Sequence, residues 1–222
     1  MACRRQLQAA RADCNLITVS LKPIDFGDKN IVLAGKRSPE SMHRQVLAGL
    51  EQIPSGWVFF CESDVLYHPS HFGFTPPTSE AYYYNEHTYK VDAMTGQAVF
   101  YYTKQVSGLC ADRDLLLEHY QKRIKRIESE GKFNLRIGYE PGCHRPPRGI
   151  DNYPATRWMA EYPNVDIRHD HNITKTRWSQ NEFRNPRACE GWQLASEIPG
   201  WGYTLGRFDV FLQEVTHERI AL

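Results

Sequence analysis

Two carboxylates follow directly on an apolar segment in the first third of the chain. Glu62 and Asp64 flank Ser63 immediately after the segment WVFFC at 57–61. In open α/β sheets, ligands bind beyond the carboxyl ends of strands. If the chain is extended here, both acids point the same way and can share one Mg²⁺ or Mn²⁺, cations that prefer oxygen ligands. Acids in this position also commonly cap the next turn, so the spacing alone leaves both interpretations open.

Glu140 lies in the Gly- and Pro-rich segment GYEPG at 138–142. A carboxylate in a loop can serve as a general base, or it can be an ordinary surface acid. Asp112 and Asp114 are poorer candidates. They stand where a helix needs an N-cap and negative charge in its first turn.

His169 and His171 follow an expected strand at 164–168. Val165 and Ile167 share a face with His169, so this imidazole could emerge at the sheet edge as a metal ligand. A surface loop rich in His and Asp would give the same pattern, and spacing does not separate the two.

The elements around these residues alternate between helices and strands. A helix at 1–13 and a strand at 16–20 precede a loop-rich stretch at 23–35, and a second helix begins at Ser38-Pro39 and stops before 54–56. The run at 57–61 is typical of a strand that is buried on both faces of a parallel sheet. Helix, short turn and buried strand together predict an α/β fold.

The second half adds a Tyr-rich region and a long helix. Three antiparallel strands are expected at 81–85, 88–92 and 98–103, with a hairpin turn at 94–96. A helix is expected from Asp112 to Glu130, ended by Gly131. The segment 138–154 is expected to be a loop, and beyond His169 an irregular, tryptophan-punctuated tail is expected to wrap a single domain that spans 1–222.

Composition excludes several classes of protein. The 27 basic and 26 acidic side chains nearly cancel, which disfavours a basic groove for nucleic acid. No apolar run approaches the roughly 20 residues of a membrane span, and no secretory signal is recognisable, so we expect a cytoplasmic protein. The six cysteines form no CxxC pair and are expected to be free thiols.

The order of these segments resembles the GT-A-fold glycosyltransferases, in particular family-2-like enzymes of phages and bacteria. WVFFC followed by ESD and VLYHPSHF resembles the central strand and its DxD-type metal motif. SGLCADR at 107–113 is similar to the acceptor-side segment, and RHDHNITKTRWS at 168–179 to a terminal motif of such enzymes. The resemblance covers about residues 5–205. The family's domain opens with a strand and loop that hold the nucleotide base, and this chain begins after that point, in the first helix.

The resemblance implies a role for each candidate residue. Asp64 would bind Mn²⁺ or Mg²⁺, His169 or its rival His171 would complete the coordination, and Glu62 would face the ribose or a water molecule. Glu140 would deprotonate the acceptor hydroxyl in an inverting transfer. The basic residues nearest the cleft would bind the diphosphate of a nucleoside-diphosphate sugar, and a tryptophan would close over this donor; these residues are Arg44, Lys175, Arg177 and Trp178.

Three functions follow as hypotheses. The first is a metal-dependent glycosyltransferase that moves a sugar from a nucleotide-sugar to an acceptor hydroxyl. The second is a metal-dependent phosphoesterase or hydrolase that uses Glu62 and Asp64 with the cluster at 169–171. The third is a non-catalytic binding module that keeps the fold of the enzyme.

Overall fold

The protein has a mixed α/β fold, in which helices cover sheets that contain both parallel and antiparallel pairs. The structure is a computed structural model, and it describes residues 2–134, 137–169, 172, 177, 179–183 and 189–201. Within these ranges, no helix is long and apolar enough to cross a membrane.

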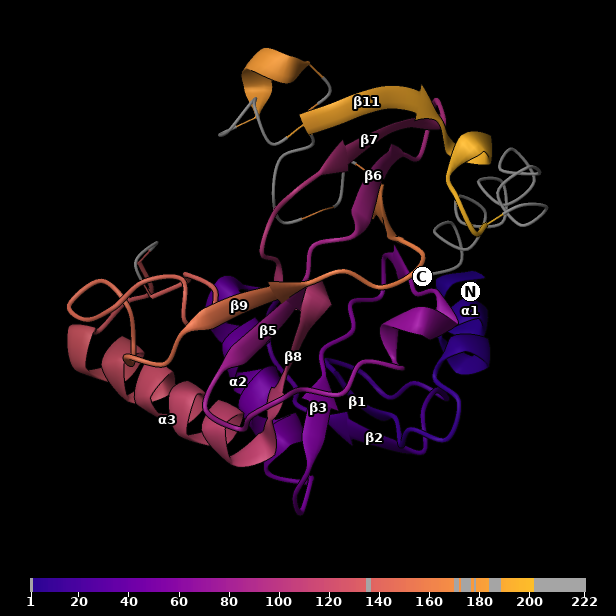
Figure 1. Cartoon of the computed structure of the whole chain (residues 1–222). Coiled ribbons are helices and arrows are strands. Elements are labelled where there is room, and N and C mark those ends of the chain that lie inside the picture. The colour runs from indigo at the N-terminus through magenta and orange to yellow at the C-terminus, as the bar shows by residue number, and fades with distance from the viewer. Residues whose placement is uncertain are drawn as a thin grey trace.

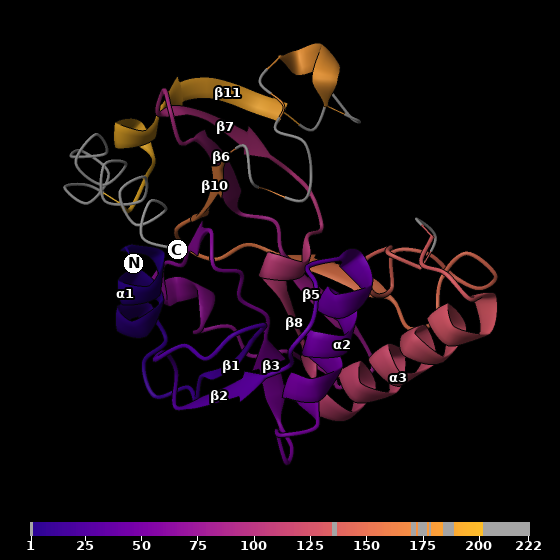
Figure 2. The same cartoon turned by 180° about the vertical axis from the view of Figure 1, so that it is seen from behind.

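A four-stranded sheet with two helices on one face forms the larger layer. Figure 1 and, from behind, Figure 2 show α2 and α3 packed side by side against it. Leu50 of α2 and Leu116 and Tyr120 of α3 meet Tyr84 and Leu109 of the sheet in one buried core. The strand order is β3 (Trp57–Phe59), β8 (Leu109–Asp112), β5 (Tyr82–Asn85) and β9 (Ala155–Trp158), and the helices are α2 (Pro39–Leu50) and α3 (Arg113–Glu130).

Local sequence explains the ends of both helices. Ser38 and Ser41 form a reciprocal capping box at the start of α2, and Pro39 occupies its first turn. Asp112 accepts hydrogen bonds from the backbone N–H groups of the first turn of α3. Gly131 ends α3 with a φ of 67°, the left-handed conformation that glycine adopts without a steric penalty.

A second, five-stranded sheet rises from one edge of the first layer (Figure 1). β6 and β7 form an antiparallel hairpin, and β10 lies parallel to β6 and antiparallel to β4. Its core includes Leu66, Val91, Val165 and Trp201. The strand order is β11 (Cys189–Leu194), β7 (Gln97–Tyr101), β6 (Thr88–Asp92), β10 (Asn164–Arg168) and β4 (Val65–Leu66).

The N-terminal part adds one helix and a small parallel sheet. α1 (Ala2–Ala10) packs Leu7 and Ala10 against Val65 and Tyr67. β1 (Ile17–Ser20) and β2 (Lys29–Val32) pair in parallel. Short 3₁₀ turns occupy Pro69–His71, Val106–Gly108, Gln180–Glu182 and Ala195–Glu197.

The expected α/β class, the helices and the hairpin are confirmed, but the interpretation of the segment 57–61 is wrong. β3 ends at Phe59, pairs antiparallel with β8, and lies at a sheet edge with Trp57 40 % exposed. It is apolar because one face lies under α2 and the other packs Phe59 against His71 and Phe72. An edge strand with both faces covered gives the same apolar run as a central parallel strand.

Other elements also differ from expectation. β5 does not join the Tyr-rich hairpin but pairs with β8 and β9. β2 lies within the stretch expected to be a loop, and β11 lies within the expected irregular tail. β11 forms because its backbone pairs with β7, a long-range contact that has no periodic signature in sequence.

Candidate functional site

The acids Glu62 and Asp64 lie in a turn that carries the chain from one sheet to the other. The Val65 N–H donates to the Glu62 carbonyl, which closes the turn. The spacing suggested that extended chain presents both acids. They lie in a turn instead. The N–H of Glu62 donates to the hydroxyl of Tyr67, which donates in turn to the Ser107 carbonyl. Tyr67 is fully buried, so it fixes the backbone of this acidic turn.

The structure brings His169 to Asp64. β10 lies beside β4, with Asp166 opposite Val65, and the Ile167 N–H donates to the Asp64 carbonyl at 2.9 Å. The Nε2 atom of His169 is then 3.8 Å from the Asp64 carboxylate. The sheet thus juxtaposes the two residues that the resemblance named as metal ligands.

Asn172 completes this arrangement from the turn that follows β10. Its side-chain N–H donates to the carboxylate of Asp64, 108 positions earlier in the chain, at 2.6 Å. Its side-chain oxygen accepts a hydrogen bond from the backbone N–H of His169, also at 2.6 Å. Asn172 therefore fixes the imidazole-bearing turn and the carboxylate together. Sequence analysis did not identify this residue.

A third acid, Asp166, faces the same region from β10 and is buried. We call Glu62, Asp64 and Asp166 the acidic cluster. Loss of hydration, together with the charges of Asp64 and Asp166, raises the pKa of Glu62 to about 8. The Glu62 residue is exposed, however, so solvent screening limits this rise. Burial and Asp166 raise the pKa of Asp64. Two carboxyl groups, Glu62 and Asp64, whose pKa is raised by burial and by neighbouring negative charge form an electrostatic setting in which a cation is bound.

Basic side chains border the acidic cluster. Lys90 of β6 lies 3.9 Å from Asp166 and over the ring of Tyr101 at 5.1 Å. Burial lowers the pKa of Lys90, and the nearby charges of Arg168 and Arg177 lower it further, while Asp166 opposes them. Arg177, which the sequence placed near the diphosphate, thus lies within electrostatic range of Lys90. Lys90 itself was missed, and its one sequence signal is its place between Tyr89 and Val91 in a short strand.

Glu140 lies in the loop between α3 and β9. Burial raises its pKa, and the charges of Arg123 and Lys90 partly offset this rise. Lys90 therefore interacts with Glu140 and with Asp166 of the acidic cluster. A carboxylate with a raised pKa accepts a proton more readily near neutral pH than an ordinary surface acid does.

The remaining predicted residues fall elsewhere. Arg44 forms ion pairs with Glu40 and Glu128 on α2 and α3, and within the described ranges its side chain contacts no member of the acidic cluster. Asp112 is the N-cap of α3 and Asp114 lies in its first turn, as expected. Three residues that were predicted to take part in the site lie outside the described residues: His171, Lys175 and Trp178.

The donors available for a metal ion are few. In the parts of the chain that the structure describes, no three His, Cys, Asp or Glu side chains converge on one point as a complete metal site. Asp64 and His169 provide one carboxylate and one imidazole. Mg²⁺, and by similar preference Mn²⁺, is commonly held by one or two protein ligands together with phosphate oxygens of the substrate. These donors therefore fit a cation that is bound jointly with a phosphorylated ligand.

Comparisons with known proteins assign no family: no family model, curated protein or solved structure matches the chain.

Proposed function

We propose that the protein is a metal-dependent glycosyltransferase that uses a nucleoside-diphosphate sugar as donor. The observation that carries this proposal is the pairing of Asp64 with His169, within electrostatic range of Asp166 and its ion-pair partner Lys90. Arg177 lies within electrostatic range of Lys90. Carboxylate, imidazole and cationic side chains in one place suit a metal–diphosphate group better than they suit a neutral ligand.

Each residue then has a defined task. Asp64 and His169 would hold Mn²⁺ or Mg²⁺, which would supply positive charge to the departing diphosphate. Lys90 and Arg177 would add their own charges to the same oxygens. Glu140 would accept the proton of the acceptor hydroxyl as that oxygen attacks the anomeric carbon, in an inverting displacement.

The test is hydrolysis of nucleotide-sugars in the presence of Mn²⁺, with a panel that varies base and sugar. Asp64→Asn keeps the shape of the side chain but removes its charge. Changing a residue that only supports a metal ligand typically lowers activity by about 10- to 100-fold. We expect the turnover of Asp64→Asn to fall by more than this, because Asp64 is a metal ligand in the proposal. Asp114→Asn is the matched control, because Asp114 is exposed in the first turn of α3. Unchanged turnover in Asp64→Asn would contradict the proposal.

The same panel separates the competing functions. A phosphoesterase would turn over simple phosphate esters and would need no nucleotide. A non-catalytic module would give no turnover, and calorimetry with Mn²⁺ and uridine diphosphate would measure whether it retains binding.

A further inference from the structure

The loop around Glu140 is held from both sides by buried side chains. Arg123 of α3 donates through Nη2 to the carbonyl of Tyr139, at 2.5 Å. Tyr84 of β5 donates through its hydroxyl to the carbonyl of Pro141, at 2.7 Å. The residues on each side of Glu140 are therefore fixed by donors from two different elements.

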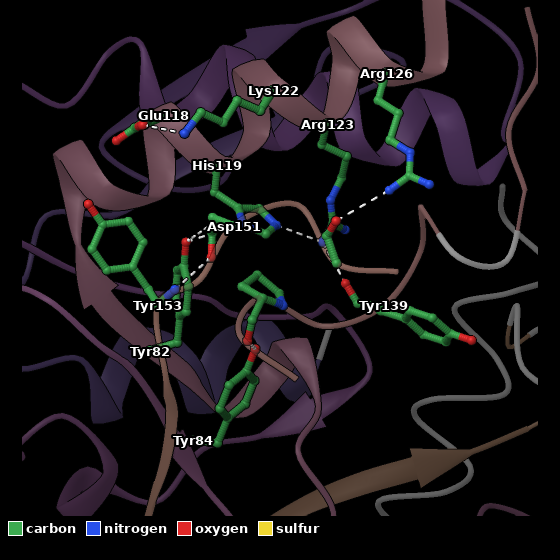
Figure 3. Close-up of polar contacts among 12 residues, drawn as sticks. Tyr82, Tyr84, Glu118, His119, Lys122, Arg123, Arg126, Tyr139, Asp151 and Tyr153 are labelled. Carbon is green, nitrogen blue, oxygen red and sulfur yellow. Dashed lines mark hydrogen bonds and ion pairs between the residues drawn. The ribbon is translucent and has the colours of Figure 1, made fainter. Parts of the chain in front are cut away.

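Arg123 is itself held in place by a chain of buried groups, shown in Figure 3. Its Nη2 atom donates to Nε2 of His119 at 2.8 Å, and Nδ1 of His119 lies 2.5 Å from Asp151. The hydroxyl of Tyr82 also donates to Asp151, at 2.8 Å. Because a guanidinium can only donate, His119 must accept at Nε2, and it therefore carries its proton on Nδ1, facing Asp151.

The electrostatics agree with this assignment. Burial lowers the pKa of His119 to about 4, so the ring is neutral at pH 7. Burial works to raise the pKa of Asp151, but the hydrogen bonds from His119 and Tyr82 outweigh it and keep the pKa below its usual value. The negative Asp151 and the positive Arg123 are thus joined through a neutral imidazole.

Such an arrangement is costly if its only purpose is to hold a loop. Arg123 is 1 % exposed, and one of its nitrogens, Nε, has no hydrogen-bond partner among the described residues. A buried ion pair often contributes no more stability than well-packed apolar side chains of similar volume would. The two donors converge on the carbonyls beside one acid, which points to a role in placing that acid.

We propose that Arg123 and Tyr84 are positioning residues for Glu140, and that His119 and Asp151 set the orientation of Arg123. This inference rests on the proposed function, in which Glu140 is the general base. It adds the means by which the base is kept in place, since a displacement of about 1 Å can cost about 100-fold in rate.

Two tyrosines on adjacent positions of β5 provide a matched pair of variants. Tyr84→Phe removes the buried hydrogen bond to the carbonyl of Pro141, whereas Tyr83→Phe removes a part-buried hydrogen bond to the carbonyl of Thr78. Both tyrosines are themselves buried. We expect Tyr84→Phe to lower kcat by about 10- to 100-fold with KM for the donor unchanged. Tyr83→Phe should leave kcat near the wild-type value. Equal kcat values for the two variants would overturn the inference.

Arg123 provides a second readout, because its charge lowers the pKa of Glu140. The other groups that interact with Glu140 are Tyr120 of α3, Tyr84 of β5, Lys90 of β6 and Cys143 of the same loop. Arg123→Met should move the acidic limb of the kcat–pH profile to higher pH. Arg123→Lys keeps the charge and should lower kcat without moving that limb. A limb that stays in place in Arg123→Met would count against the inference.

Glu140→Gln distinguishes the failure of this inference from failure of the proposed function. Full turnover in that variant would remove Glu140 as the base, and both proposals would fall. Loss of turnover in Glu140→Gln together with identical behaviour of Tyr84→Phe and Tyr83→Phe would overturn the positioning role alone.

Discussion

Lys90 is the residue that connects the two halves of the proposed site. It forms an ion pair with Asp166 and lowers the pKa of Glu140. Burial disfavours the protonated, charged form of Lys90 and so lowers the pKa of its amine. A diphosphate that approaches the acidic cluster would add negative charge near this amine and would favour its protonated form.

We therefore expect Lys90→Met to weaken the binding of nucleoside diphosphates in the presence of Mn²⁺ by about 10-fold or more. Methionine keeps most of the length and the apolar stem but removes the charge. The measurement is isothermal titration calorimetry. Lys122→Met serves as the control, since Lys122 pairs with Glu118 on the exposed face of α3. Equal affinities in the two variants would rule out a role for Lys90 in binding the anion.

Some site residues could be predicted from sequence because their signals are local. Glu62 and Asp64 follow an apolar segment, and His169 follows the expected strand at 164–168, so a sheet edge was a reasonable place for all three. Asp166 and Lys90 could not be found this way. They face each other because β10 pairs in parallel with β6, in a register that matches Asp166 with Lys90. Such register is decided by packing between distant segments and leaves no local trace.

At the scale of elements, α3 carries Arg123, one of the two side chains that hold the loop around Glu140, so the stability of this helix matters to the site. Its N-cap Asp112 accepts the N–H groups of Asp114 and Leu115. We expect Asp112→Ala to lower the free energy of unfolding by about 1 kcal/mol, because these donors lose their partner.

Urea denaturation measures this loss. Asp114→Ala is the comparison, because Asp114 is exposed and pairs only with the neighbouring Arg113 in the described ranges. Its effect should stay within about 0.5 kcal/mol. If both variants were equally destabilised, the cap would not be the cause.

The helices were predictable from sequence, whereas several strands were not. Ser38-Pro39 and Asp112, together with Gly131, are signals within a few residues of the helix ends, and the apolar periodicity between them is also local. β8 and β9 have only four residues each and gain their stability from partners in the sheet, Tyr83 and Tyr84 of β5 among them. Whether such a short segment forms a strand depends more on the strands that it pairs with than on its own sequence.

At the scale of the whole molecule, buried histidines should make stability depend on pH. Burial lowers the pKa of His43 to about 3, of His71 to about 3 and of His119 to about 4. In the unfolded chain these imidazoles become protonated below about pH 6.5. In the folded protein they stay neutral until the pH approaches their lowered pKa values. Their contribution to the free energy of unfolding is therefore complete above pH 6.5 and is lost as the pH falls from 6.5 toward the folded pKa.

Glu62 titrates in the opposite sense, because its folded pKa is raised. A single variant separates the two effects. His43 packs against the rings of Tyr120 and Phe133, so His43→Phe keeps an aromatic ring there and removes the titrating group. Between pH 7 and pH 5 this variant should lose about 2 kcal/mol less free energy of unfolding than the wild type, by urea denaturation. Equal losses would mean that His43 does not titrate as a buried group.

The position of β10 between β6 and β4 has a consequence for the order in which the protein is made. Asn172, just beyond β10, is 108 positions after Asp64, to which it donates. At about 5–20 residues per second, a ribosome needs roughly 5 to 20 seconds to make this stretch. In the part of that interval that follows Tyr101, β4 and the β6–β7 hairpin have been made, but β10, the strand between them, has not. Their unpaired edges are then open to other chains, which makes synthesis the period of greatest risk of aggregation.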